Sequence, residues 1–179
     1  MKALIVIDFT YDFVVGQLPV GQPALQIEER VAALAEEFIL NKDWVVMAVD
    51  AHDAHDPYHP ESKLFPAHNV RGSQGRELFG KLKEIYQAHA QTVYWMDKVR
   101  YSAFCGTDLD LQLRARAIKE IHLAGVCTDI CVLHTAIDGY QKGYGLTVHA
   151  DAVASFNQAG HRWALNHFQA VLGAKILPA

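Results

Sequence analysis

The stretch of the chain best suited to covalent chemistry is IHLAGVCTDICVLHTAIDGYQKGY, at residues 121–144. Its first six residues form an apolar run typical of a buried strand, and the part after the turn repeats apolar and small residues at helical spacing. Cys131 lies where that helix is expected to begin, and the positive end of a helix dipole favours a thiolate. Cys131 is therefore a candidate nucleophile; the alternative is a small apolar side chain packed at a helix start.

A carboxylate and an ammonium group follow two other apolar runs. Asp8 ends the run at residues 3–7, and Lys98 follows the run at residues 92–96. If these runs are parallel strands, their carboxyl ends meet with the turn before Cys131 along one edge of the sheet. A lysine there favours the thiolate, and a carboxylate can take and return protons. Each residue also has an ordinary alternative, a helix cap for Asp8 and a surface charge for Lys98.

The long polar loop at residues 51–69 suggests a metal site. Asp50 and His52 alternate along an extended segment and so point to the same side, and Glu61 and His68 follow within the loop. Two imidazoles and two carboxylates suit one divalent transition metal such as zinc, manganese or iron. The same loop also reads as a polar surface segment, and it offers three rival ligands, His55, Asp56 and His59.

Apolar runs alternate with amphipathic segments along the whole chain. The runs predict strands at residues 3–7, 44–49, 92–96, 121–126, 146–150 and 174–177. The amphipathic segments predict helices at residues 24–41, 75–90, 107–118 and 157–172, besides the helix carrying Cys131, and residues 9–23 predict a loop. This alternation predicts a single-domain, three-layer α/β fold, with a central parallel sheet of about six strands and helices on both faces.

The composition predicts one globular domain over residues 1–179 and argues against several classes of partner. The formal net charge is -4 and no basic block appears, which argues against nucleic acid and anionic membranes. The apolar runs are too short for a signal peptide or a membrane span. Three cysteines, an odd number, favour a reducing cytoplasm. The sequence leaves a homo-oligomer open.

Four segments together resemble the nicotinamidases, within the isochorismatase-like cysteine hydrolases. The segments are IDFTYDF, VDAH with the later HPESKLFPAHN, WMDKVRYSAFCGTDL and GVCTDICVLHTAIDGY. They run through nearly the whole chain in the order of the family. The loop with Asp50, His52, Glu61 and His68 resembles nicotinamidases rather than isochorismatases, whose relatives lack a metal site.

The resemblance implies a role for each matching residue. Cys131 would be the nucleophile, Asp8 the general base and acid, and Lys98 the third member of the triad. Asp50, His52, Glu61 and His68 would bind the metal. The backbone N–H groups of Cys127 and Cys131 would form an oxyanion hole after a cis Val126–Cys127 bond. The pocket for a flat pyridine ring would be lined by Phe13, Phe65 and Tyr101.

The activity that the resemblance implies is metal-dependent hydrolysis of nicotinamide to nicotinate and ammonia through a cysteine thioester, a step of NAD salvage. Pyrazinamide is a second expected substrate, and Zn²⁺ is the preferred metal, with Mn²⁺ or Fe²⁺ as alternatives. Three other functions remain open: hydrolysis of another small amide, a structural zinc module, and a thiol redox protein using Cys127 and Cys131. The spacing of this pair, CxxxC, differs from the CxxC of thioredoxin-like motifs. Cys105 is expected at the pocket edge or buried, and no role is assigned to it.

Overall fold

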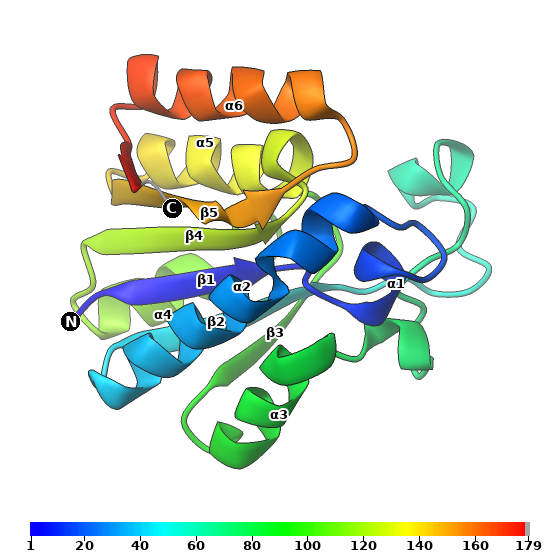
Figure 1. Cartoon of the computed structure of the whole chain (residues 1–179), viewed down its shortest axis with the longest axis horizontal. Coiled ribbons are helices and arrows are strands. Elements are labelled where there is room, and N and C mark those ends of the chain that lie inside the picture. The colour runs from blue at the N-terminus through cyan, green and yellow to red at the C-terminus, as the bar shows by residue number, and fades with distance from the viewer. Residues whose placement is uncertain (178–179) are drawn as a thin grey trace.

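The centre of the molecule is a six-stranded sheet in the order β3-β2-β1-β4-β5-β6, in which every neighbouring pair is parallel. A computed structural model describes residues 1–177 of the chain (Figure 1). The strands are β1 (Ala3–Ile7), β2 (Trp44–Asp50), β3 (Tyr94–Lys98), β4 (Glu120–Val126), β5 (Gly145–Ala154) and β6 (Lys175–Leu177). The predicted parallel sheet is thus confirmed, and the two residues beyond β6 within the predicted domain lie outside the described part.

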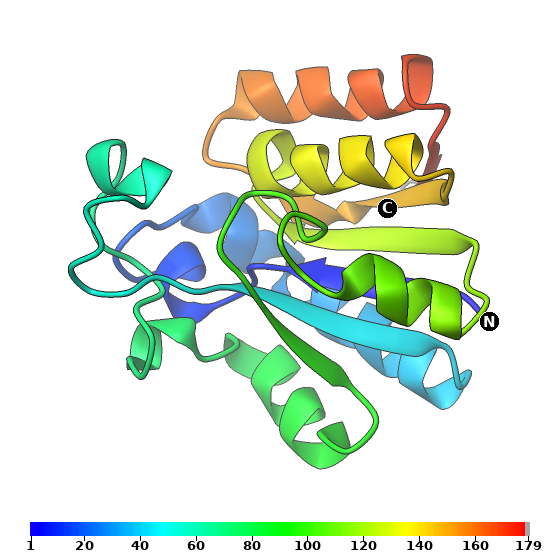
Figure 2. The same cartoon turned by 180° about the vertical axis from the view of Figure 1, so that it is seen from behind.

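Helices cover both faces of the sheet, as the alternating pattern predicts (Figures 1 and 2). One face packs against α1 (Tyr11–Val14), α2 (Gln22–Leu40) and α3 (Gly80–His89), and the other against α4 (Leu109–Ala115), α5 (Leu133–Gln141) and α6 (Gln158–Ala170). Successive strand residues point to opposite faces, so Leu4 and Val6 belong to the α2 side and Ile5 to the α5 side. The three-layer α/β prediction is therefore confirmed.

The order of the strands creates a crevice at one place on the carboxyl edge of the sheet. From β1 the chain moves outward to β2 and β3, and it then returns to β4 on the other side of β1. Connections from β1 and β4 consequently leave in opposite directions, the arrangement at which open α/β sheets bind ligands. At this edge β1 and β4 approach closely: a Cβ added at Gly125 would lie 2.0 Å from the Ile7 carbonyl oxygen, so only glycine fits.

Several predicted boundaries differ from the observed ones, in part because of tertiary contacts. The helix expected from residue 75 begins only at Gly80, because the preceding segment pairs with the chain after β1: Tyr11 N–H donates to the Glu77 carbonyl (2.9 Å) and Phe79 N–H to the Phe9 carbonyl (3.1 Å). Strand β3 begins and ends two residues later than predicted, since its last residue pairs with the last residue of β2. Strand β5, predicted at residues 146–150, continues to Ala154, where it pairs with Val126 of β4. Residues 9–23, predicted as a loop, contain the short helix α1.

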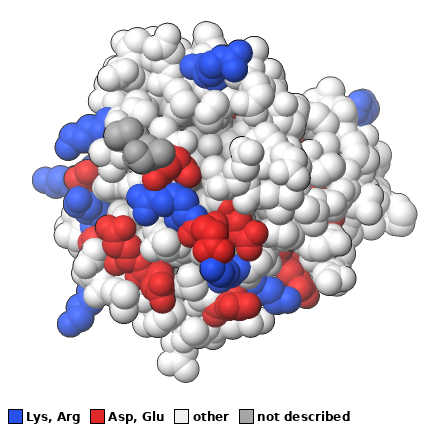
Figure 3. Space-filling view, viewed as in Figure 1, with Lys and Arg blue, Asp and Glu red and all other residues white. Residues whose placement is uncertain are grey.

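Charged side chains on the face shown in Figure 3 gather over α2 and α3, with both signs interleaved, while the upper and right-hand parts of this face are mainly uncharged. Lys81 of α3 pairs with Glu29 of α2 at 2.5 Å.

Within residues 1–177 no helix combines the length and the apolarity needed to cross a bilayer.

A pair of buried histidines lies between the sheet and α2. His122 of β4 and His149 of β5 are 5% and 3% exposed, and His122 Nδ1 lies 2.9 Å from His149 Nε2. The Phe38 ring of α2 covers both at centroid distances of 5.0 and 6.4 Å. Burial lowers the pKa of both imidazoles, that of His149 to about 4. The pair is therefore neutral in the folded protein at pH 7.

The pair should make the fold less stable as the pH falls. In the unfolded chain each histidine binds a proton near pH 6.5, whereas folded His149 resists protonation down to about pH 4. The contribution of the neutral His149 to the free energy of unfolding is fully present above pH 6.5. It is lost progressively between pH 6.5 and pH 4, because the unfolded state binds more protons than the folded state in this range. We expect the Tm to fall by about 5 °C more between pH 7 and pH 5 in the wild type than in His149→Gln, whose amide still bonds His122 but does not titrate. Equal slopes for the two proteins would contradict this.

Candidate active site

Asp8 lies at the carboxyl end of β1 with its side chain fully buried. Its backbone φ of 54° lies in the left-handed region, which turns the chain sharply at the end of the strand. One carboxylate oxygen accepts a hydrogen bond from the Asp50 N–H at 2.8 Å, and the other lies 2.7 Å from Lys98 Nζ. The carboxylate therefore joins β1 to the ends of both β2 and β3.

The ammonium group of Lys98 contacts two carboxylates and one thiol at this end of the sheet. Lys98 is the last residue of β3 and is 1% exposed. Besides Asp8, its Nζ lies 3.4 Å from Asp50 Oδ1 and 3.7 Å from Cys131 Sγ, and it donates to the Arg100 carbonyl at 3.3 Å. The three residues predicted as a triad, Asp8, Lys98 and Cys131, are thus brought together around one buried cation.

Cys131 lies in a turn of π-helix, Thr128–Val132, between β4 and α5. The Val126–Cys127 bond before this turn is cis, as the resemblance implies, and the N–H groups of Ile130 and Val132 both donate to the Cys127 carbonyl at 3.1 Å. The regular helix begins only at Leu133, so the prediction that an α-helix starts at Cys131 is wrong by two residues.

Hydrogen bonds fix the backbone of Cys131, and burial disfavours the charged form of its thiol. The Thr135 hydroxyl donates to the Cys131 carbonyl at 2.8 Å and accepts from the Ala103 N–H at 3.0 Å. Burial raises the pKa of the Cys131 thiol well above its usual value, and the nearby Lys98 opposes this without reversing it. The pKa of this thiol thus shifts in the direction opposite to the one expected from the helix dipole and the lysine, because desolvation of the charged form is the largest effect.

The Asp8 carboxyl and the Lys98 ammonium differ in their ability to exchange a proton. Burial raises the pKa of the Asp8 carboxyl above its usual value, against the opposing effect of Lys98. For Lys98 itself, burial acts to lower the pKa, but the charges of Asp50 and Asp8 raise it well above the usual value. The ammonium therefore keeps its proton, and Asp8 is the group able to take up and release one.

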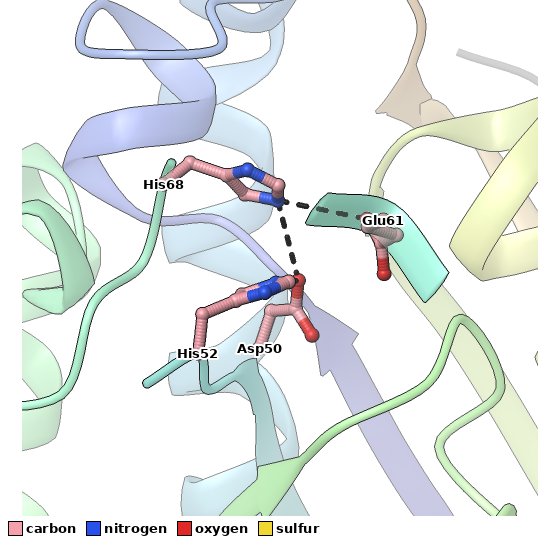
Figure 4. Close-up of side chains that lie close together, drawn as sticks. All are labelled: Asp50, His52, Glu61 and His68. Atoms are coloured by element: carbon pink, nitrogen blue, oxygen red, sulfur yellow. Dashed lines mark hydrogen bonds and ion pairs between the residues drawn. The ribbon is translucent and has the colours of Figure 1, made fainter. Parts of the chain in front are cut away.

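The four residues predicted as metal ligands converge beside the triad (Figure 4). One ligand atom from each of Asp50, His52, Glu61 and His68 lies within 4.8 Å of all the others, and all four residues are buried. Asp50 Oδ2 is 2.6 Å from His52 Nε2 and 3.5 Å from His68 Nε2, which is in turn 3.7 Å from Glu61 Oε2. Because Asp50 Oδ1 contacts Lys98, one carboxylate belongs to both clusters.

The hydrogen bonds of this group fit a bound divalent ion. His68 Nδ1 lies 2.8 Å from the Pro66 carbonyl and must carry the proton, so Nε2 presents a lone pair to the other three side chains. That buried Nε2 has no hydrogen-bond partner within the described residues. Two imidazoles and two carboxylates are a donor set suited to zinc, manganese or iron. The rival ligands His55, Asp56 and His59 lie outside the group.

A narrow cavity borders Cys131 and extends to Glu61. Its walls include Phe13, Phe65 and Tyr101, the three residues predicted to contact substrate. Five more residues line it, namely Leu18, Glu61, Cys127, Ile130 and Phe156. Ile130 lies within the CTDIC motif and could have been predicted, but Leu18 and Phe156 are single apolar residues in loops, for which periodicity gives no signal.

The other two cysteines differ from Cys131. Cys127 is buried, and burial raises the pKa of its thiol to about 12, which makes it a poor nucleophile for disulfide exchange. Cys105 is exposed, so the expectation that it is buried or at the pocket edge is wrong. Its segment turns outward after Phe104, whose side chain occupies the core.

The chain belongs to the isochorismatase family: the model of the isochorismatase domain matches residues 2–177. Among solved structures, it is similar to the nicotinamidase/pyrazinamidase PncA of Bacillus subtilis, with 56% identity and a TM-score of 0.96 over 98% of this chain and 99% of that one. It is also similar to the pyrazinamidase/nicotinamidase of Streptococcus mutans UA159, with 51% identity and a TM-score of 0.96 over 99% and 100% of the two chains. The pyrazinamidase of Pyrococcus horikoshii in complex with zinc shares 28% identity, with a TM-score of 0.86 over 99% of both chains. The predicted resemblance to the nicotinamidases of this family is thereby confirmed.

Removing the ammonium of Lys98 should destabilise the fold strongly. Lys98→Met leaves Asp8 and Asp50 as neighbouring buried carboxylates without a cation, at a cost of about 3 to 5 kcal/mol in the free energy of unfolding. Lys83→Met is the matched control, because Lys83 pairs with Glu77 at 2.7 Å on the surface, where such pairs contribute about 1 kcal/mol or less. Urea unfolding of both variants measures the difference, and equal losses would contradict the prediction.

Proposed function

We propose that this protein hydrolyses nicotinamide to nicotinate and ammonia, with Cys131 as the nucleophile and one divalent metal ion beside it. The observation that carries the proposal is the contact of Lys98 Nζ with Asp8, Asp50 and Cys131, because it joins a nucleophile, a proton carrier and the metal-binding group in one buried site. The 51% to 56% identity with nicotinamidases supports the choice of substrate.

The first half of the reaction forms a thioester. Cys131 Sγ attacks the carboxamide carbon while its proton passes to Asp8, whose raised pKa suits it to accept. The negative charge that develops on the carbonyl oxygen would be stabilised by the N–H groups of Cys127 and Cys131. Asp8 then protonates the amide nitrogen, the C–N bond breaks and ammonia leaves, with the acyl group bound to sulfur. Lys98 keeps its charge throughout and stabilises the thiolate as it forms.

The second half releases the acid. Asp8, again a carboxylate, takes a proton from water, and the hydroxide attacks the thioester carbon. The C–S bond breaks, nicotinic acid leaves, and the proton returns from Asp8 to Cys131 Sγ. In solution the acid loses its own proton to the released ammonia, which gives nicotinate and ammonium. One water is consumed over the cycle, and all protein groups return to their starting state.

The substrate ring would be held between Phe13, Phe65 and Tyr101, with its nitrogen directed towards Glu61 and the metal-binding group. When bound, the metal would supply a positive charge that orients the ring nitrogen. Asp50, His52, Glu61 and His68 would hold this ion, with zinc preferred because the similar Pyrococcus horikoshii pyrazinamidase was solved with it, and Mn²⁺ or Fe²⁺ as alternatives. Pyrazinamide would fit the same pocket, and nicotinate production would serve NAD salvage.

A single substitution tests the nucleophile. Cys131→Ala should reduce ammonia release from nicotinamide by at least about 10⁴-fold, because no other group can form the acyl intermediate. The variant should keep the wild-type circular dichroism spectrum and metal content. Cys105→Ala, which changes an exposed thiol, should match the wild type. Activity of Cys131→Ala near the wild-type rate would refute the assignment, and loss of turnover in Cys127→Ala together with reversible oxidation of both thiols would favour the redox alternative.

Chelation tests the metal. Dialysis against a strong chelator should abolish nicotinamide hydrolysis, and one equivalent of Zn²⁺ should restore it, because the ring nitrogen would lose its partner. Elemental analysis of His52→Ala should show loss of the ion, while His55→Ala, altered outside the group, should retain it. An enzyme indifferent to the chelator would contradict the metal-dependent mechanism.

A further inference from the structure

His59 is a buried imidazole that the mechanism does not use. It precedes the 3₁₀ turn Pro60–Lys63 in the loop between β2 and α3 and is 8% exposed. Its ring lies against that of His52 at a centroid distance of 4.2 Å, so it adjoins the metal-binding group without belonging to it.

Both ring nitrogens of His59 already have partners, and the partners determine the tautomer. Nδ1 lies 3.3 Å from the Glu61 backbone nitrogen, and Nε2 lies 2.9 Å from the Val99 carbonyl oxygen. A backbone N–H can only donate and a carbonyl can only accept, so Nδ1 must present its lone pair and Nε2 must carry the proton. No lone pair remains for a metal ion, which explains why this histidine is not a ligand.

The two partners belong to the two halves of the site. Glu61 supplies a carboxylate to the metal-binding group, and Val99 directly follows Lys98. The main chain of the turn is held as well, because the Ser62 N–H and hydroxyl donate to the His59 carbonyl at 3.1 and 2.7 Å. His59 therefore spans the space between the loop that carries Glu61 and the strand end that carries the ammonium.

We propose that His59 is a positioning residue: the Val99 carbonyl fixes the Nε2–H tautomer, and the lone pair of Nδ1 thereby holds Glu61 where it can bind the metal ion. The inference rests on the proposed function only in requiring that Asp50, His52, Glu61 and His68 hold a divalent ion. Loss of a partner that orients a ligand typically weakens metal binding by about 10- to 100-fold.

Three variants separate the two hydrogen bonds. The side-chain oxygen of asparagine takes the place of Nδ1, and the amide nitrogen of glutamine takes the place of Nε2–H. The dissociation constant for Zn²⁺ is measured by competition with a chromogenic chelator. We expect His59→Ala to bind zinc about 10- to 100-fold more weakly than the wild type. His59→Asn, which keeps the acceptor for the Glu61 N–H, should bind within about threefold of the wild type, and His59→Gln should stay at least about tenfold weaker. His55→Ala is the control on the same loop and should bind zinc normally.

A second readout distinguishes positioning from a purely structural role. At a fixed ligand concentration, a ligand that binds the folded state more tightly raises the Tm further, because the stabilisation grows with the logarithm of the affinity. A structural defect would lower the Tm of zinc-free and zinc-loaded protein alike, whereas the proposal requires a smaller zinc-induced rise in His59→Ala. Wild-type affinity or an unchanged zinc-induced rise in His59→Ala overturns the inference, and so does a His59→Asn variant as weak as His59→Ala.

These measurements do not depend on nicotinamide. A wild type that binds zinc without hydrolysing nicotinamide refutes the proposed function, while the zinc affinities of the variants still decide the role of His59. A wild type that binds no divalent ion overturns both.

Discussion

The structure depends on a single buried positive charge. The Lys98 ammonium has no access to solvent, and a charge so placed is tolerated only because two carboxylates and a carbonyl surround it. Asp8 and Asp50 in turn need the ammonium, because two buried carboxylates so close together would repel each other in its absence. The three strand ends that carry these residues are therefore held together by an interaction that none of them could satisfy alone.

This interaction links the two chemical parts of the site. Asp50 presents one oxygen to the lysine and the other to the imidazoles of His52 and His68. A change in the charge of the metal-binding group therefore acts on the ammonium directly, because only the Asp50 carboxylate lies between them. The parallel sheet supplies the geometry, because Asp50 and Lys98 are register partners at the ends of β2 and β3, and Asp8 directly follows the neighbouring strand β1.

Much of this arrangement could be predicted from the sequence, because the pattern of apolar residues determines where the strands begin and end. Continuous apolar runs locate the buried strands, and a parallel sheet brings their carboxyl ends together, so Asp8 and Lys98 are found from position alone. Residues 75–79 are predicted as the start of an α-helix, but they hold only the end of a short 3₁₀ turn, Gln74–Arg76, because the segment pairs with the chain after β1 and local periodicity does not contain such a long-range contact. The protonation of Cys131 was also missed, because a sequence shows a nearby lysine but not the extent of desolvation, which raises the thiol's pKa.

The role of His59 illustrates another limit. In the sequence it is one of four histidines in a loop and an equally good ligand, and only the hydrogen bonds of its two nitrogens separate it from His52 and His68. Identity of residue type is thus a weak guide within a histidine-rich loop, and the partners of each nitrogen decide.

The residues that line the cavity come from two kinds of segment. Cys131, Asp8 and Lys98 lie at or just after the carboxyl ends of β4, β1 and β3, whereas Leu18 and Phe156 come from connecting loops that carry none of the proposed reactive groups. Substitutions in these loops can change the shape of the cavity while the side chains of Cys131, Asp8 and Lys98 keep their positions. Relatives built on this scaffold can therefore diverge in the molecules they admit long before they diverge in the bond they break.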